Sequence, residues 1–352
     1  MSKETLQRTQ GANRLAYIDM AKAAALFVVV LFHKQGMQQT MLQRFGTAFH
    51  MPVFFFLFGM TTSGGKNLDS LWQGVRRRFR SLMVPYYLWV VICTSTWDFS
   101  LRSILMIIYG SHPGITAAGT NATLWFLPTM FVSACLFDVV TFYEKAETSE
   151  KKCLMLNVVA IVAAAALSFV LNEVVPYLPI VSIGRYPLNM DIALSGFCFL
   201  MTGHLLRSWI DKIRCKSNSL LLLLSVVLFL ATLLLAEANQ VRIVMARGIY
   251  GNYILFLAAG LTGSIGVVLL MAFCERFMGV ACRPMTWLGQ HSLFVFASHH
   301  IVFKVLNRCY QLFGIQKLAS IPGIFMYSML AITICCLCCA VIGRLVPALE
   351  GK

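Results

Sequence analysis

Charged residues are scarce in this chain, and acidic residues are the scarcest. Of 352 residues, 12% are charged, and only 14 are Asp or Glu against 29 Lys or Arg. No long polar segment is present, so we expect no soluble catalytic domain and predict a single transmembrane domain over residues 1–352. The net charge of +15 then indicates basic cytoplasmic loops rather than binding to nucleic acid.

Hydrophobic residues make up 59% of the chain and recur in long runs. Apolar stretches of about 18 or more residues are typical of membrane helices. The first run contains Asp19 and Lys22 and no cleavage-site pattern follows it, so we expect a retained helix rather than a signal peptide. We predict an all-α integral membrane protein with about ten spans, near 16–36, 46–64, 81–98, 123–143, 153–172, 190–207, 218–236, 251–273, 286–306 and 320–342. The shorter apolar segment 101–110 is predicted to lie at the membrane interface or to re-enter.

Basic residues are distributed unevenly over the loops between these spans. If the N-terminus is cytoplasmic, 19 Lys and Arg fall in inner segments and 8 in outer ones. An excess of this size predicts that both termini are cytoplasmic. The tract from Arg76 to Arg80, which includes Arg78, then faces the cytoplasm. It either anchors the topology or docks a phosphorylated ligand, since Arg binds phosphate through two parallel contacts.

Twelve cysteines are present, and most of them lie within apolar runs. Cys335, Cys336, Cys338 and Cys339 resemble a metal-binding spacing, but no His or carboxylate is close to them in the sequence. A structural zinc ion needs four converging ligands, and buried free Cys usually behaves as a small hydrophobic residue. We therefore expect no metal site, and a disulfide framework is not expected in this setting.

Two histidines stand at matching ends of the first two apolar runs. His33 closes the run 23–32, and His50 opens the run 51–58. A short loop joins the two predicted helices, so they should be antiparallel, with both imidazoles at similar depth near one membrane face. Ionisable groups in apolar spans are costly and indicate function by default. We predict that the two histidines share a site for acid–base chemistry.

Asp19 and Lys22 lie on the same predicted helix as His33. Lys22 and His33 are eleven residues apart, close to three helical turns, so they share a face about 16 Å apart along the axis. Asp19 is three residues before Lys22, so the two side chains can pair. One interpretation is that the charges of Asp19 and Lys22 only neutralise each other near the inner interface. The other is that Lys22 and His33 lie on one functional face of the helix.

Further polar residues gather at the predicted outer ends of the helices. Each has an ordinary explanation when it is taken singly: Trp125 as an interfacial aromatic residue, Arg185 as a loop charge, and one of His299 and His300 pointing away from any shared site. Together they outline a polar cavity that opens outward. The set comprises His50, Asn121, Trp125, Arg185, Asn189, Asp191, Arg247, Asn252, Tyr253, His299 and His300.

Several motifs resemble the membrane-bound acyltransferase family 3. The first two are Arg14-x-x-x-x-Asp19-x-x-Lys22 followed by His33, and Phe49-His50-Met51-Pro52-x-Phe54-Phe55-Phe56-x-x-Gly59. Weaker ones are Arg80 to Tyr86, Leu124 to Leu127, and Leu288 to Leu293 with His299-His300. The resemblance covers essentially the whole chain and is strongest to sugar O-acetylases of the fucose-acetylase type. The chain departs from the family at Lys22, where Arg is common, and at Phe58, where Ser is common.

The resemblance implies an acyl-CoA donor, typically acetyl-CoA, bound from the cytoplasm and held by Arg76, Arg78 and Arg80. It implies transfer of the acyl group to a hydroxyl of a cell-surface glycan or its lipid-linked precursor, in a bacterial cytoplasmic membrane. His33 is the expected base or acyl carrier, with Asp19, Lys22 and His50 as further catalytic residues. Trp125, Arg185, Asp191, Asn252 and His300 are the expected acceptor-binding residues. Membrane lipid is the expected surrounding partner, and the oligomeric state, a homodimer included, stays open.

A different class of function also fits these residues. Ionisable residues within spans serve transport as well as catalysis, so the chain could export a glycan or a small solute through the same cavity. Many transporters carry internal repeats or paired broken helices, and the sequence shows neither. A non-catalytic ligand-sensing domain is a third interpretation, which the presence of His33 disfavours.

Overall fold

The computed structural model describes residues 15–33, 40–65, 67–94, 100–174, 185–313 and 320–352. Within these ranges the chain is helical, and its one extended contact is the isolated bridge between Val244 and Ile249. The longer helices are α2 (Ala16–His33), α3 (Met41–Thr61), α8 (Phe126–Ala146), α9 (Glu150–Val174), α10 (Met190–Arg214), α11 (Asn218–Asn239), α12 (Tyr253–Met278), α14 (Ser292–Leu312) and α15 (Ile321–Leu345). The shorter ones are α4 (Leu68–Arg78), η1 (Phe79–Met83), α5 (Val84–Cys93), α6 (Leu101–Tyr109), α7 (His112–Ala117), η2 (Ala122–Trp125), η5 (Pro187–Asn189), η6 (Met245–Arg247), η7 (Gly279–Cys282), α13 (Arg283–Gln290) and η8 (Pro347–Glu350).

Each of the ten predicted spans falls on helical residues. The predicted ends 34–36 and 95–98, and Arg14 of the first motif, lie outside the described residues. In the described ranges, six helical segments are long and apolar enough to cross a membrane: α2, η2 with α8, α9, α11, the segment from α12 to α13, and α15. The spans predicted on α3, α5, α10 and α14 are not among them. The helix α5 has only ten residues, whereas α10 packs against α3, α8 and α9, so much of its surface faces protein.

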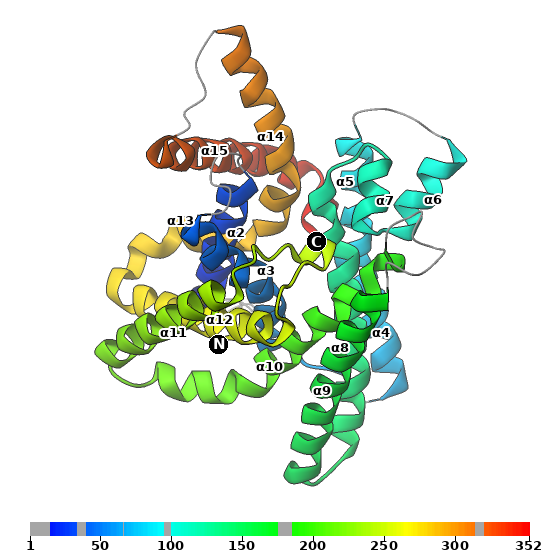
Figure 1. Cartoon of the computed structure of the whole chain (residues 1–352), viewed down its shortest axis with the longest axis vertical. Helices are drawn as coiled ribbons and strands as arrows, with labels where there is room; N and C mark the ends of the chain where they lie inside the picture. The colour runs from blue at the N-terminus through cyan, green and yellow to red at the C-terminus, as the bar shows by residue number, and fades with distance from the viewer. Residues whose placement is uncertain (1–14, 34–39, 66, 95–99, 175–184, 314–319) are drawn as a thin grey trace, which may run out of the picture.

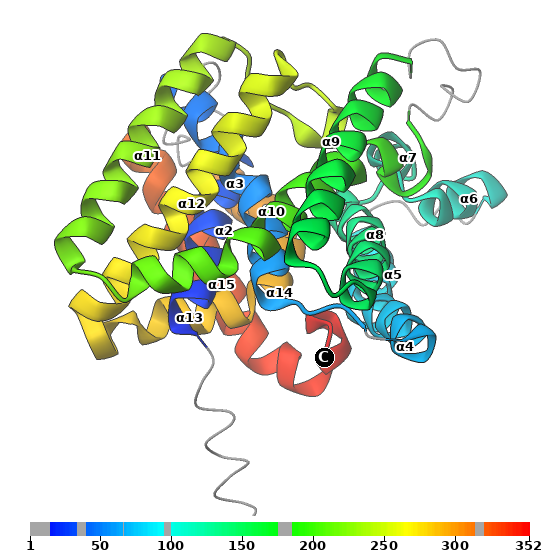
Figure 2. The ribbon, with the colours of Figure 1, turned by 90° about the horizontal axis from the view of Figure 1, so that it is seen from below.

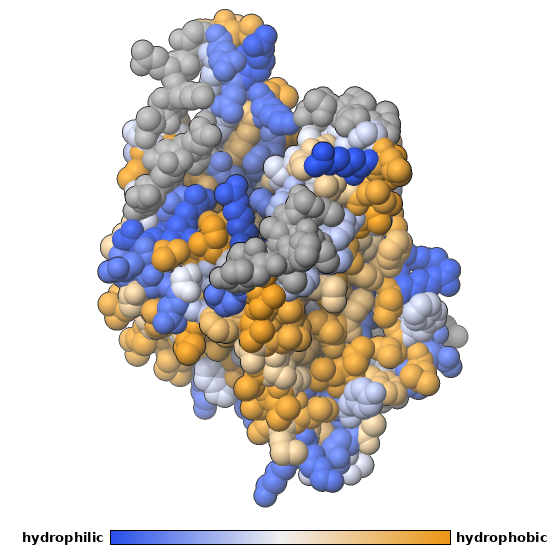
Figure 3. All heavy atoms as spheres, turned by 45° about the vertical axis from the view of Figure 1, so that its right-hand side comes forward, coloured by the Kyte–Doolittle hydropathy of each residue, from blue (hydrophilic) through white to orange (hydrophobic). Residues whose placement is uncertain are grey.

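The helices differ in how much of their surface is covered by other helices. Most of α2 is buried, because it packs against α3, α12 and α13. By contrast, α9 and α11 lie at the periphery in Figures 1 and 2 and expose rows of large apolar side chains, such as Val158, Val162 and Leu230. Figure 3 shows a broad hydrophobic face bordered by hydrophilic residues. Such a surface suits lipid rather than water, because soluble proteins rarely expose large apolar patches.

Contacts between loops agree with the predicted alternation of sides. Lys145 donates a hydrogen bond to the Gly64 carbonyl, and Arg276 donates one to the Arg214 carbonyl. Both contacts join segments predicted on the inner side. At the opposite ends, Arg44 pairs with Glu237, joining two segments predicted on the outer side. Figure 2 places α4, α13 and the C-terminal end along one edge of the molecule.

The short helix α6 confirms that segment 101–110 does not continue into a longer span. It has nine residues and ends at Gly110, which adopts a left-handed conformation with φ of 66°. Leu101, Ile104, Leu105 and Ile108 are exposed on its surface. An exposed apolar face on a short helix is typical of an element at a membrane interface.

A buried ion pair joins α4 to α8. Arg78 donates to Asp138 through two nitrogens, at 3.1 and 2.8 Å, and both residues are buried. Its guanidinium also lies over the Phe58 ring, 4.7 Å from the centroid. Arg78 is therefore part of the helix packing and does not share the solvent exposure of Arg76, Arg77 and Arg80.

We expect Arg78→Ala to destabilise the folded protein strongly, because the change leaves Asp138 buried without its partner. Breaking a buried ion pair from one side typically costs about 3–5 kcal/mol. Thermal unfolding of the purified protein in detergent measures the effect. Arg77→Ala, which removes an exposed guanidinium of the same helix, is the control and should change the midpoint little. Equal midpoints for the two variants would contradict a structural role for Arg78.

Candidate active site

Both predicted histidines line one cavity, which we call the histidine cavity. His33 comes from the last residue of α2 and His50 from α3. The cavity volume is about 70 Å³, enough for one end of a sugar but not for a whole glycan. Its walls come from α2, α3, η2, α14 and the segment before α12. The lining residues are Val29, Phe32, His33, Thr47, His50, Met51, Thr123, Trp125, Arg242, Ile243, Val244, Met245, Ala246 and Phe296.

Backbone carbonyls orient the two imidazoles. His33 Nδ1 lies 2.8 Å from the Val29 carbonyl oxygen, and His50 Nδ1 lies 3.1 Å from the Gly46 carbonyl oxygen. A carbonyl only accepts, so each Nδ1 carries the proton and donates it. In the neutral ring, Nε2 then has the free lone pair. Each ring is thus held in the tautomer that can accept a proton at Nε2.

Two further histidines of α14 pack against His33. The His33 ring centroid lies 5.1 Å from that of His299 and 5.0 Å from that of His300. The expectation that one of the adjacent histidines points away from the site is therefore wrong, because both imidazole rings reach His33. His299 Nδ1 donates to the Phe296 carbonyl at 2.7 Å, and the Nε2 atoms of His299 and His300 are buried without a hydrogen-bond partner.

Lys22 lines a second cavity on the opposite side of Phe296. We call it the lysine cavity; its volume is about 200 Å³. Lys22 pairs with Asp19 at 3.2 Å, so Asp19 acts on the cavity through Lys22. Apart from Lys22 the walls are mostly apolar, and Gly289, Gln290 and Ser292 add polar atoms. The lining residues are Lys22, Phe54, Phe58, Thr61, Leu82, Phe126, Leu127, Met130, Gly289, Gln290, Ser292, Leu293 and Phe296.

Among the residues that the structure describes, Phe296 is the one shared by the linings of the lysine and histidine cavities. Its ring packs against Phe126 with centroids 5.3 Å apart, and Phe126 packs against Phe54 at 5.7 Å. Lys22 and His33, predicted to share one face of α2, thus border two cavities that meet at an aromatic wall. A slender group that reaches Phe296 in the lysine cavity therefore contacts a residue that also lines the histidine cavity.

Three arginines surround a third, open cavity beside α4 and η1. Arg76, Arg77 and Arg80 line it with Gln73, Ser81, Gly351 and Lys352, and its volume is about 610 Å³. Ser81 precedes Leu82 of the lysine cavity, so the two cavities are neighbours along η1. We call this the arginine cavity. Arg78, which the sequence grouped with Arg76 and Arg80, is turned away into the ion pair with Asp138, and Arg77 lines the cavity instead.

The close approach of α13 to α2 positions the floor of the lysine cavity. A Cβ atom at Gly289 would stand 1.8 Å from the Asp19 carbonyl oxygen, so only glycine allows this approach. We expect Gly289→Val to prevent α13 from docking and to lower the yield of folded protein sharply. Size-exclusion chromatography in detergent measures the yield, and Ala281→Val is a control, because Ala281 is an exposed residue of the adjacent η7. Normal folding of Gly289→Val would contradict this packing.

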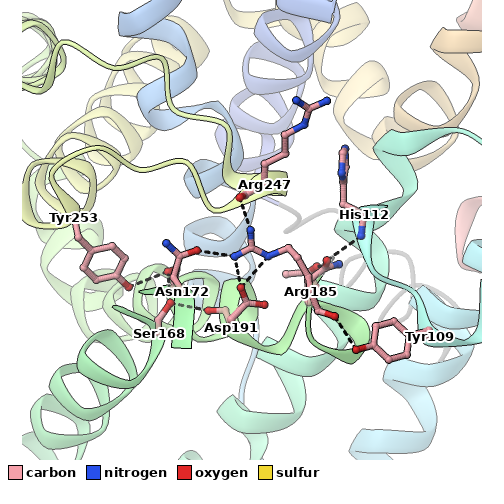
Figure 4. Close-up of polar contacts among 11 residues, drawn as sticks. Tyr109, His112, Ser168, Asn172, Arg185, Asp191, Arg247 and Tyr253 are labelled. Atoms are coloured by element: carbon pink, nitrogen blue, oxygen red, sulfur yellow. Dashed lines mark hydrogen bonds and ion pairs between the residues drawn. The ribbon is translucent and has the colours of Figure 1, made fainter. Parts of the chain in front are cut away.

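The remaining predicted acceptor residues divide into two groups. Trp125 lines the histidine cavity and His300 packs against His33. Arg185 and Asp191 instead form a buried ion pair that braces neighbouring segments (Figure 4). Arg185 also donates to Asn172 and to the Arg247 carbonyl. Asn252 caps the start of α12, and Asn121 donates to the Ala297 carbonyl beside the site.

Arg242, Thr123 and Phe296 also line the histidine cavity, and the sequence alone did not mark them as functional. Arg242 lies in a loop, and a loop arginine at a membrane surface has no local signal that separates function from topology. Phe296 lies in an apolar run, where a phenylalanine is ordinary. Only the assembled cavity, to which α14 and the segment before α12 both contribute, shows that these residues come together.

Among the residues with described positions, two side-chain groups have a spacing that could hold a metal ion. One is His33, His299 and His300, and the other is His291, Cys339 and Glu350; in each group the ligand atoms lie within 4.8 Å of one another. No His or carboxylate is close to these cysteines in the sequence, but the fold brings both to Cys339: His291 Nδ1 lies 2.6 Å from Glu350 Oε2, and Cys339 Sγ lies 3.5 Å from Glu350 Oε1. This proximity could not be predicted from the sequence, because it depends on η8 folding back onto α15.

Comparison with known proteins supports the resemblance seen in the motifs. The family model described as an acyltransferase domain, acyltransferase 3, matches residues 15–340. One relative, nodulation protein NolL of Mesorhizobium japonicum, is 28% identical over 145 residues, which cover 38% of this chain and 38% of NolL. The chain thus matches well under two thirds of that relative. The family match, by contrast, spans all the helices that build the three cavities, and this chain belongs to the acyltransferase 3 family.

Proposed function

We propose that this protein is an integral membrane O-acyltransferase that moves an acyl group, acetyl in the first instance, from cytoplasmic acyl-CoA to a glycan hydroxyl. The acceptor is a cell-surface glycan or its lipid-linked precursor. The observation that carries the proposal is the pair His33 and His50, each with Nδ1 bonded to a carbonyl, on a cavity that meets the lysine cavity at Phe296.

The order of the three cavities suits a CoA thioester. The exposed guanidinium groups of Arg76, Arg77 and Arg80 are available for the phosphates of the donor. The pantetheine arm would occupy the mostly apolar lysine cavity, with Lys22 near its polar amides. Its thioester end would then arrive at Phe296, next to His33. The acceptor would enter the histidine cavity from the other side and present one hydroxyl.

Acyl transfer needs a base and a route for one proton. In the direct mechanism, Nε2 of His33 takes the proton of the acceptor hydroxyl while its oxygen attacks the thioester carbonyl carbon. The carbon–oxygen bond forms, the carbon–sulfur bond breaks, and the imidazolium returns the proton to the leaving thiolate. The products are the ester and free CoA. Alternatively, Nε2 attacks the thioester carbonyl carbon and CoA leaves as the thiolate. The acceptor hydroxyl then attacks the acyl-imidazole, its carbon–nitrogen bond breaks, and the hydroxyl proton passes to the thiolate. His50 would orient the acceptor in both cases.

The proposal includes the topology of about ten spans with both termini in the cytoplasm and a bacterial cytoplasmic membrane as the location. The distribution of basic residues and the contacts between loops on each side support it. The test is transfer of labelled acetyl from acetyl-CoA by the purified protein in liposomes, with mass spectrometry of the glycan product. Ester-linked label on the glycan supports the proposal; label that stays on CoA with every glycan acceptor tested overturns it.

We expect the triple change Arg76→Gln, Arg77→Gln and Arg80→Gln to raise the KM for acyl-CoA with little change in kcat. Phosphate contacts far from the thioester hold the ground state and the transition state equally, and losing such uniform binding raises KM alone. Each lost charged contact is worth about tenfold in affinity. Steady-state kinetics with varied acyl-CoA measures the effect. The control is Arg102→Gln, another exposed arginine, which lines none of these cavities. An unchanged KM for acyl-CoA would contradict donor binding by these arginines and would indicate that they only anchor the topology.

A further inference from the structure

We infer that the acceptor carries a negatively charged group, a sugar carboxylate or a phosphate, which Arg242 and Arg247 recognise beside the reacting hydroxyl. The inference rests on the proposed function, because it assigns the histidine cavity to the acceptor. It concerns the chemical class of the acceptor and the residues that select it.

Arg242 places a positive charge on the wall that faces His33 and His50. It lines the histidine cavity, and none of the described residues that line this cavity is acidic. The carboxylates of nearby elements have other partners: Glu237 pairs with Arg44, and Asp191 pairs with Arg185. Arg242 therefore has no ion-pair partner among the described residues.

Arg247 places a second positive charge on a neighbouring cavity. This His112 cavity is lined by His112, Pro113, Thr116, Ala117, Arg185 and Arg247, and its volume is about 510 Å³. Figure 4 shows that Arg185 bonds the main-chain carbonyl of Arg247, while the Arg247 guanidinium points away toward the side of the His112 ring. Burial, with the charges of Arg247 and Arg185, lowers the pKa of His112 to about 4, so His112 is neutral at pH 7.

The loop that carries both arginines is held rigidly. Val244 and Ile249 exchange two backbone hydrogen bonds, at 2.9 and 3.2 Å. Asn239 bonds the Tyr250 carbonyl and the Asn252 amide, and Arg185 holds the Arg247 carbonyl from below. A Cβ at Gly248, where φ is 62°, would stand 2.3 Å from Arg185, so the loop sits directly on this brace.

Two like charges at fixed positions repel each other, and an anion bound beside them offsets this repulsion. Arg242 and Arg247 are held on one braced loop, and burial, with a smaller effect of the Arg247 charge, lowers the pKa of Arg242. Arg binds carboxylates and phosphates through paired, planar hydrogen bonds. An anionic group of the acceptor would offset this positive charge and fix the neighbouring hydroxyl near His33.

The test compares acceptors that differ only in charge. One pair is an oligosaccharide with a uronic acid and the same oligosaccharide after carboxyl reduction; the other is a polyisoprenyl diphosphate-linked sugar and the same sugar as an uncharged alkyl glycoside. The measured quantity is the ratio of kcat/KM for the charged acceptor over the neutral one. We expect a ratio of about ten or more in at least one pair, as one charged contact would give. The pair that shows it identifies the anion as a carboxylate or a phosphate.

Arg242→Gln and Arg247→Gln should each lower this ratio, and Arg242→Lys should keep part of it, since Lys keeps the charge. Arg102→Gln is the control and should leave the ratio unchanged. Quenching of tryptophan fluorescence by each acceptor measures binding without transfer, because Trp125 lines the cavity. If nothing is acylated but charged glycans still bind better in an Arg242-dependent way, the proposed function fails and this inference stands. Equal use and equal binding of charged and neutral acceptors overturns the inference, and so does a preference that neither arginine change affects.

Discussion

His33→Ala should reduce acyl transfer by at least about a hundredfold while the protein stays folded and inserted, because general acid–base catalysis contributes about 10²–10⁴ in rate. The Nδ1 of His33 is held by the Val29 carbonyl, so its Nε2 is available to the cavity. Alanine removes that nitrogen and leaves α2 otherwise intact. Insertion should not suffer, since the helix becomes more apolar.

The measurement is the initial rate of glycan acylation at matched protein levels, with thermal unfolding in detergent as the check on folding. His50, His299 and His300 also lie near the site. Any activity that remains in the His33→Ala protein can therefore come from one of these histidines. His50→Ala is the matched comparison and should cost less if His50 only orients the acceptor. Substantial acylation by a folded His33→Ala protein would assign His33 a structural role.

Phe296→Trp should lower kcat/KM for the donor by about a hundredfold, because a misplacement of the reacting groups by about 1 Å has an effect of that size. Within the described part of the chain, Phe296 alone borders both the lysine and the histidine cavity. A larger ring there should keep the thioester from His33, while the arginine cavity, lined by other residues, still binds the phosphates.

The expected pattern is therefore a loss of transfer with acyl-CoA binding retained, measured by isothermal calorimetry beside the kinetics. Phe325→Trp is the control, since Phe325 is an exposed residue of α15. If Phe296→Trp binds donor normally and transfers at the normal rate, the thioester does not pass this wall. If Phe296→Trp fails to bind acyl-CoA and also unfolds at a lower temperature than the unchanged protein, the change has damaged packing. Phe296→Leu then provides a milder test of the same wall.

The sequence was sufficient for the helices and for the two central histidines. Long apolar runs locate helices directly, and ionisable residues inside such runs stand out because they are costly there. His33 and His50 could be paired because a short loop links their helices. Lys22 and His33 could be placed on one face because the helical repeat fixes their relative direction.

Contacts between helices far apart in the sequence could not be predicted in this way. Whether both His299 and His300 reach His33 depends on the packing of α14 against α2, which no local pattern encodes. Arg78 and Arg77 are adjacent and chemically alike, so only the position of Asp138 on α8 decides which of them is buried. The same holds for Arg185, whose pairing with Asp191 turns an apparent acceptor ligand into a brace.

The most direct test of the central claim places donor and acceptor on opposite sides of one membrane. Protein reconstituted in a single orientation would receive acyl-CoA on the side of Arg76, Arg77 and Arg80, and glycan on the side of Arg242. We expect acylated glycan in this arrangement and none when donor and glycan are placed on the reverse sides. The His33→Ala protein should be inactive in both arrangements. Equal product in both arrangements, or product only when donor and glycan share one side, would contradict transfer across the wall at Phe296.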